Sequence, residues 1–249
     1  MGAGRPRMSV AIVGLFQQGK STLVNCLCRE NKVEMGNGWK SETSQNSAAI
    51  VVSDSLEVID TPGMDDTQER TEEARKAIEI ADSVLVMLDN EKALGEKDLA
   101  VMKCAVELHR RLILLCNCKN ASPPAWKPLS AENRAYCERL GEQIALEGWE
   151  ASVLPVDGRK VFPVNLQWAR YGLGLLEATN EDFEVLADRF RGGRKEALGE
   201  SQFLPLDRFL RALPLEVLKA IAAHPDQEVE RVGRRFADLF GQRMKAEAM

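Results

Sequence analysis

The sequence predicts an α/β fold, a doubly wound and mostly parallel sheet with helices on both faces, followed by further helices at the C-terminal end. Short apolar, β-branched runs alternate along the chain with stretches whose apolar residues recur at helical spacing. The runs are continuously apolar, which is typical of parallel strands buried on both faces. A glycine-rich segment between the first run and the first helical stretch is the third observation.

That glycine-rich segment fits a phosphate-binding loop. Residues 9–13 are predicted to form a buried strand, and residues 21–28 are predicted to form a helix. Between them the chain places two glycines, separated by four residues and followed by Lys20 and Ser21. Glycines allow backbone N–H groups to turn inward around phosphates, and the free N–H groups of a helix start face the same anion. The pattern therefore predicts a nucleotide site.

In that site Lys20 reaches the β- and γ-phosphates and Ser21 holds magnesium. Most of the phosphate contacts come from backbone N–H groups. The predicted nucleotide-binding residues of this segment are Gly14, Gln17, Gln18, Gly19, Lys20, Ser21 and Thr22.

A second signal follows a predicted hairpin. Residues 31–46 are polar and contain two glycines, which indicates a loop. Runs at 48–52 and 56–59 flank a Ser-Asp-Ser turn and predict two paired strands. The second strand ends at Asp60, which is the first residue of an Asp-Thr-Pro-Gly segment. A carboxylate delivered there orders the water shell of a magnesium ion, so Asp60 is predicted to be a metal residue.

The rest of the predicted sheet domain alternates helices and strands. Helical spacing or a continuous apolar run defines each element. The predicted elements are a helix from 67 to about 81, a strand at 84–88, a helix around 99–106, a strand at 112–116, a helix at 130–146, runs at 153–156 and 161–164 around an Asp-Gly turn, and a helix at 165–176.

Two segments complete the predicted organisation. An acidic insertion at 177–203 carries one short helix at 182–189, and residues 204–213 return to the domain. We expect a nucleotide-binding domain at 8–213 and a helical extension at 214–249. The extension carries an apolar stripe, expected to fold back onto the domain, with dimerisation as the alternative. The stripe consists of Val229, Val232, Phe236, Leu239 and Met244.

The composition and charge of the chain limit the classes of binding partner and the cellular location that we expect. The formal net charge is -5 and the sequence pI is near 5.4, with Lys and Arg spread along the chain, so nucleic acid is not an expected partner. Six cysteines form no pair of Cys-x-x-Cys units, which indicates reduced thiols. The chain has no transmembrane-length apolar run, and its first eight residues contain no apolar signal core. We expect a cytoplasmic protein without a transmembrane segment.

Residues 14–27 (G-L-F-Q-Q-G-K-S-T-L-V-N-C-L) and 60–63 (D-T-P-G) together resemble the translation-factor class of GTPases. The phenylalanine form of the loop is most similar to bacterial dynamin-like and Era-like members. Over about residues 8–215, the resemblance implies a P-loop G domain that binds GTP or GDP with Mg²⁺. It implies that Thr43 lies near the metal and the γ-phosphate, and that Gly63 senses this phosphate through its backbone N–H. Three other residues of the loop compete with Thr43 for its role: Ser41, Ser44 and Ser47.

The resemblance therefore divides the site residues by role. It makes Lys20, Thr43 and Gly63 catalytic, and it makes Ser21, Thr43 and Asp60 the metal residues. Family members read the base with Asn-Lys-x-Asp, where this chain has Asn-Cys-Lys-Asn, so the base-reading candidates are Asn117, Lys119 and Asn120.

Three departures from the family bear on function. Asn120 has one acceptor face and a donor where an aspartate would accept twice from guanine, so base selectivity stays open. Residues 164–167 (V-N-L-Q) replace the usual Ser-Ala-Lys motif. Met64 stands where many small GTPases place a water-orienting glutamine. Catalysis then has to come from a bound ion, a protein partner or a homodimer across the nucleotide face.

The sequence thus supports a Mg²⁺-dependent guanine-nucleotide-binding protein that hydrolyses GTP slowly as a molecular switch. The alternative is a nucleotide-sensing pseudo-GTPase scaffold, which binds a protein partner with little turnover. A P-loop kinase or ATPase is a third option. The Asp-Thr-Pro-Gly segment after a hairpin argues against it.

Overall fold

A computed structural model of the chain describes residues 7–33, 49–64, 68–90, 94–108, 110–119, 127–178, 180–214 and 217. Two predicted site residues, Thr43 and Asn120, lie outside the described residues. The predicted C-terminal stripe at 229–244 also lies outside them.

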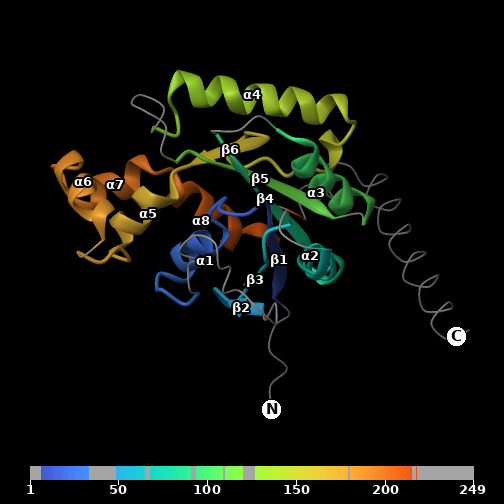
Figure 1. Ribbon diagram of the computed structural model, residues 1–249, viewed down its shortest axis with the longest axis horizontal. Helices are drawn as coiled ribbons and strands as arrows, with labels where there is room; N and C mark the ends of the chain where they lie inside the picture. Colours follow the sequence, from blue (N-terminus) through green and yellow to red (C-terminus); the bar gives the residue numbers. More distant parts are fainter. Residues whose placement is uncertain are drawn as a thin grey trace, which may run out of the picture.

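The described chain forms one six-stranded sheet, in the order β2-β3-β1-β4-β5-β6 (Figure 1). Four of the five strand pairs are parallel, and the β2–β3 hairpin is the antiparallel exception. This topology confirms the predicted mostly parallel sheet. The strands are β1 (Met8–Val13), β2 (Ala49–Val51), β3 (Leu56–Asp60), β4 (Ser83–Asp89), β5 (Arg111–Asn117) and β6 (Val161–Val164).

Helices cover both faces of this sheet (Figure 1). One core joins the sheet to α1 (Lys20–Cys28), α5 (Leu166–Leu173) and α8 (Phe203–Arg211). The other core joins it to α2 (Gln68–Ile80), α3 (Glu96–Glu107) and α4 (Ala131–Leu146). The sheet is therefore doubly wound, as the continuously apolar strand sequences predict.

Side chains along a strand point alternately to the two faces of the sheet, so a single apolar strand contributes to both cores. In β1, Val10 and Ile12 enter the core with α1, while Ala11 and Val13 enter the core with α2. All four side chains are fully buried. Since successive side chains of a strand point to opposite faces, a strand between two helical layers needs an apolar residue at each position.

One predicted strand is absent from the described structure. The run at 153–156 makes single bridges only, from Val153 to Leu112 and from Val156 to Arg159, and a short 3₁₀ turn (Glu150–Ser152) precedes it. The run at 161–164 is β6, parallel to β5, as predicted. The chain turns back at Asp157-Gly158, and both residues have positive φ. Val156 and Arg159 exchange two backbone hydrogen bonds across this turn, and from Val161 onward the chain pairs with β5 instead of extending the hairpin.

The predicted insertion holds two helices, α6 (Glu181–Arg189) and α7 (Arg194–Glu200), instead of one. The two glycines before α7 suggested a break, but Gly193, at φ +78, is the N-cap of α7. Both helices pack with α5 in a small third cluster, visible at one end of the molecule in Figure 1. There Trp168 meets Phe190 edge-on at 5.0 Å between ring centroids, and Arg189 lies 4.6 Å from the Trp168 ring.

The six cysteines are free thiols, as expected from their spacing. Within the described ranges, none of the helices is both long and apolar enough to cross a bilayer.

Candidate functional site

The glycine-rich loop joins the carboxyl end of β1 to the start of α1, and both of its glycines are required by geometry. Gly14 has φ +151, and a Cβ there would lie 2.4 Å from Oε1 of Gln18 and 2.8 Å from the Met87 carbonyl oxygen. Gly19 has φ +96, and a Cβ there would lie 2.7 Å from Nδ2 of Asn117. No larger residue fits either position without moving the loop.

Lys20 begins α1 and is buried. Its ammonium group donates to the carbonyl oxygens of Leu15 at 2.8 Å and Gly14 at 3.2 Å. The free backbone N–H groups at the start of α1 lie at the same place as this positive charge, and a helix start of this kind favours a negatively charged ligand.

Ser21 and Asp60 meet beside this lysine. The Ser21 hydroxyl donates to Oδ2 of Asp60 at 2.9 Å, which joins the start of α1 to the end of β3. The other carboxylate oxygen, Oδ1 of Asp60, is buried and has no hydrogen-bond partner among the described residues. Burial raises the pKa of the Asp60 carboxyl, while the Ser21 hydroxyl, the Lys20 charge and the Thr61 backbone N–H act in the opposite direction.

This pair fits a magnesium ion. A buried carboxylate oxygen without a partner is costly, and a divalent cation would offset that cost. Mg²⁺ prefers oxygen ligands and commonly takes one or two from the protein, with phosphate and water completing its shell. Within the described part of the chain no three His, Cys, Asp or Glu side chains gather as a metal cluster. The donor set of Ser21 and Asp60 thus suits a metal bound together with a phosphate ligand.

The segment after β3 lies against the loop. The Met64 amide donates to the Gly14 carbonyl at 3.4 Å, and the hydroxyl of Thr61 donates to the Ile12 carbonyl at 2.7 Å. Gly63 is buried at this junction. The Met64 side chain packs against the core with α2 and α3, and a thioether offers no strong donor or acceptor for positioning a water molecule.

Gln18 braces the loop from within. Its Oε1 accepts from the Leu15 amide at 2.6 Å, and its Nε2 donates to Oδ1 of Asp98 at 3.2 Å. Asp98 lies in the first turn of α3, where its Oδ2 accepts from the Gly95 amide at 3.1 Å. The Gln18 side chain is therefore turned into the protein, and only its backbone remains for the predicted phosphate contact.

This brace predicts a rescue experiment in the ligand-free protein. Gln18→Glu places a second carboxylate against the buried Asp98, and we expect a loss of about 2–4 kcal/mol of unfolding free energy. Adding Asp98→Asn restores one donor and one acceptor between the two side chains. The double variant should recover most of the loss in urea or thermal unfolding.

Gln17→Glu is the matched control, because it adds the same charge to the same loop at an exposed position. We expect it to change stability by less than about 0.5 kcal/mol. Equal losses for the two glutamate variants, or no recovery in the double variant, would contradict the brace.

The segment after β5 is held by the loop on one side and by α5 on the other. Nδ2 of Asn117 donates to the Gln18 carbonyl at 3.1 Å, and its Oδ1 accepts from the Leu166 amide at 3.3 Å. Nδ2 of Asn165 donates to the Cys118 carbonyl at 2.7 Å, while its Oδ1 caps α5. Asn117 is thus a structural link between the phosphate loop and the predicted base-reading segment.

The Lys119 side chain extends from the segment after β5 to the tip of the glycine-rich loop. Its ammonium group donates to the Gln17 carbonyl at 2.5 Å and pairs with Asp89 at 2.9 Å. Gln17 itself is exposed and has φ +61, an uncommon conformation for a residue other than glycine. The Lys119 contact supports this strained tip.

The structure gathers most of the predicted residues at the carboxyl edge of the sheet. The loop follows β1, Asp60 ends β3, and Asn117 ends β5. Sequence reasoning missed three bracing residues, Asp89, Asp98 and Asn165. An N-cap signal was available for Asn165 alone, since asparagine before a helical stretch is a common cap.

The sheet order and the loop between β1 and α1 define the fold of the described residues as that of a P-loop G domain. Residues 9–118, less than half of the chain, match the family model of the 50S ribosome-binding GTPase. This part of the chain is thus related to P-loop GTPases of the translation-factor class, which confirms the resemblance seen in the sequence.

Two curated relatives illustrate the relationship. GTPase Der from Orientia tsutsugamushi (strain Ikeda) is 30% identical over 124 residues, which are 45% of this chain and 27% of Der. The tRNA modification GTPase MnmE from Alkaliphilus oremlandii (strain OhILAs) is 30% identical over 118 residues, 45% of this chain and 25% of MnmE. The matches span only about a quarter of the length of these relatives.

Solved structures share the fold. Era from Aquifex aeolicus bound to GDP·AlF₄⁻ has a TM-score of 0.50 at 17% identity, covering 71% of this chain and 59% of that one. The bacterial selenocysteine-specific elongation factor EF-Sec also has a TM-score of 0.50, at 16% identity, covering 76% of this chain and 29% of that one.

Proposed function

We propose that this protein binds a guanine nucleotide with Mg²⁺ and hydrolyses GTP slowly, as a molecular switch. The observation that carries the proposal is the Ser21–Asp60 pair, with a buried, unpartnered carboxylate oxygen beside the phosphate-loop lysine. The relationship to GTPases over residues 9–118 supports guanine as the base. We assign the nucleotide to residues 8–213, with residues 214–249 as an extension.

Most of the predicted residues have a role in this proposal. Lys20 and the backbone N–H groups of the loop bind the phosphates, and Ser21 and Asp60 hold the metal. Bound Mg²⁺ would neutralise charge on the phosphate oxygens. Thr43 is proposed as a further metal residue, and Gly63 as a backbone contact to the γ-phosphate. Asn120 is proposed to contact the base.

Slow hydrolysis follows from the residue after Gly63. The partly buried Met64 side chain packs against the core, and its thioether supplies no group to orient the attacking water. The same observation favours a second candidate, a nucleotide-sensing scaffold with little turnover. For the slow GTPase, a homodimer or a protein partner across the nucleotide face would supply the group that orients the water. For the scaffold, the same partner would bind according to which nucleotide is present.

Nucleotide-dependent melting and phosphate release test the proposal together. At 100 times the Kd, a ligand adds about 2.7 kcal/mol of stability, which is roughly 5–10 °C in a domain of this size. We expect such a shift with GDP and GTP in Mg²⁺ and a smaller one with ATP, with xanthosine diphosphate testing the role of Asn120.

The rate of phosphate release then separates the two candidates. Turnover on the order of 10⁻³ s⁻¹ supports a slow switch. A full melting shift without release above background supports the scaffold. Rapid release by a monomer contradicts slow intrinsic hydrolysis, and no shift with any nucleotide contradicts the proposal as a whole.

A further inference from the structure

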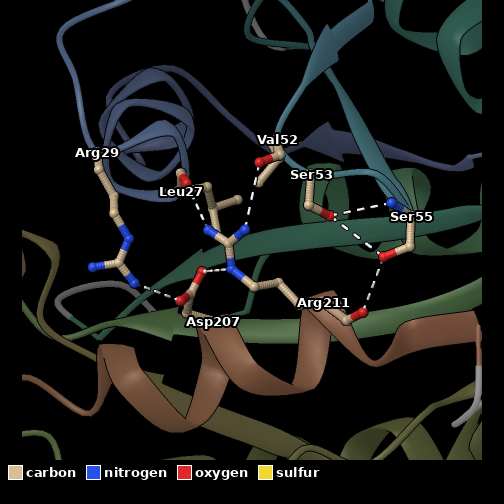
Figure 2. Close-up of polar contacts among 7 residues, drawn as sticks. All are labelled: Leu27, Arg29, Val52, Ser53, Ser55, Asp207 and Arg211. Carbon is tan, nitrogen blue, oxygen red and sulfur yellow. Dashed lines mark hydrogen bonds and ion pairs between the residues drawn. The ribbon is translucent and has the colours of Figure 1, made fainter.

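Arg211, near the end of α8, joins three elements that are distant in sequence (Figure 2). Its guanidinium group donates to the carbonyl of Leu27 at 3.1 Å and to the carbonyl of Val52 at 3.4 Å. Its Nε donates to Asp207, one turn earlier in α8, at 2.9 Å. The first contact reaches the end of α1, and the second reaches the turn between β2 and β3.

Asp207 strengthens this junction. Its side chain is only 6% exposed, and its second oxygen accepts from Arg29 at 2.9 Å. Arg29 is the C-cap of α1, with φ +58. Removing an arginine partner from a buried carboxylate is costly, because the charge that remains has lost its solvation and is no longer compensated. The end of α1 is therefore tied to α8 twice, through Leu27 and through Arg29.

The turn between β2 and β3 is also tied twice. Besides the Val52 contact, the Ser55 hydroxyl donates to the Arg211 carbonyl at 3.2 Å, and Ser53 lies within hydrogen-bond distance of Ser55 (Figure 2). Ser55 immediately precedes β3. The side chain and the backbone of Arg211 thus hold the end of α1 and the start of β3 in one arrangement.

At their other ends, α1 and β3 carry the two residues of the proposed metal site. Helix α1 begins with Lys20 and Ser21, and β3 ends with Asp60. Both elements are short, nine and five residues, and both pack into the same core as α8. Rigid secondary elements carry a displacement of one end to the other. Helix α1 is held rigid by its own hydrogen bonds, and β3 is held by its ladders to β1 and β2.

We infer that Arg211 is a positioning residue for the metal site, which fixes α1 relative to β3 and so sets the Ser21–Asp60 geometry from the far side of the domain. This inference rests on the proposed binding of a Mg²⁺–nucleotide complex. Linkage requires the converse effect: binding of the Mg²⁺ complex stabilises α8.

The test compares fluorescent GDP binding in Mg²⁺ and in EDTA. In Arg211→Ala, we expect the gain in affinity that Mg²⁺ confers to fall by roughly three- to tenfold, with the affinity in EDTA unchanged. Arg208→Ala is the matched control, because Arg208 is exposed on the same helix and loses the same charge. It should behave as wild type.

Arg211→Lys provides a milder variant in case the alanine variant does not fold. A lysine keeps the charge beside Asp207, but one ammonium group does not reproduce the planar fork that reaches both carbonyls. We expect an intermediate loss of the Mg²⁺ effect. Hydrogen exchange of the α8 amides should slow on Mg²⁺–GDP binding in wild type and respond less in both Arg211 variants.

The outcomes separate this inference from the proposed function. If wild type binds GDP and the Mg²⁺ effect is the same in wild type and both Arg211 variants, the inference is overturned and the proposed function stands. Equal losses in Mg²⁺ and EDTA also overturn it, because they indicate a general loss of structure. Failure of wild type to bind GDP in either condition overturns the proposed function, and the inference with it.

Discussion

Lys20→Ala is expected to weaken GDP and GTP binding by roughly 100-fold, since a charge-assisted hydrogen bond contributes about 1.5–3 kcal/mol and each 1.4 kcal/mol is a factor of ten. The fold should remain intact. The Lys20 ammonium contacts loop carbonyls and lies near Asp60, whereas the buried apolar side chains make up the two cores. Titration calorimetry or fluorescent-nucleotide binding measures the loss, and circular dichroism checks the fold.

Lys103→Ala is the control for charge and residue type. Lys103 lies on α3 and its side chain is 65% exposed. We expect its removal to leave nucleotide affinity within about twofold of wild type, as for surface substitutions away from a site. Unchanged GTP affinity in Lys20→Ala would remove the central claim that the glycine-rich loop binds the phosphates.

Leu206→Ala is expected to destabilise the protein by about 2–5 kcal/mol, the usual range for a fully buried leucine, with a drop in Tm of roughly 5–15 °C. Leu206 is 0% exposed on α8 and packs in the core with α1, α5 and the sheet. The loss combines the transfer of the removed methyl groups with the cavity that they leave.

Leu204→Ala removes the same atoms two residues earlier in the same helix, at a side chain that is 37% exposed. We expect this control to cost less than about 1 kcal/mol. Urea unfolding of both variants gives the comparison directly. Similar losses at the two positions would show that α8 does not pack on the sheet as described, and would also weaken the role assigned to Arg211.

Much of the architecture was predictable because local patterns report burial. Continuous apolar runs indicated β1, β4 and β5, since only strands covered on both faces tolerate an apolar residue at each position. The serine before residue 131 indicated the start of α4, and its side chain does accept from the Asn133 amide. The missed helix α7 shows the limit of such patterns. A glycine pair predicts a break equally well before a helix and inside a loop.

The residues of the candidate site also fall into two groups, those that could be predicted from the sequence and those that could not. The sequence by itself determined the glycine-rich loop, because its glycines, Lys20 and Ser21 lie within eight residues and the phosphate contacts predicted for them depend on this spacing. It also determined Asp60, because the end of a strand places its side chain at the carboxyl edge of the sheet.

Only the tertiary structure decided which groups support these residues. Gln18 and Asp98 are 80 residues apart, and Leu27 and Arg211 are 184 apart, so no local pattern joins them. A buried amide or guanidinium group needs a partner, and the need can be predicted from the sequence. The identity of the partner depends on which elements the sheet order brings together. That order is set by the packing of two apolar cores, to which all six strands and the helices α1 to α5 and α8 contribute.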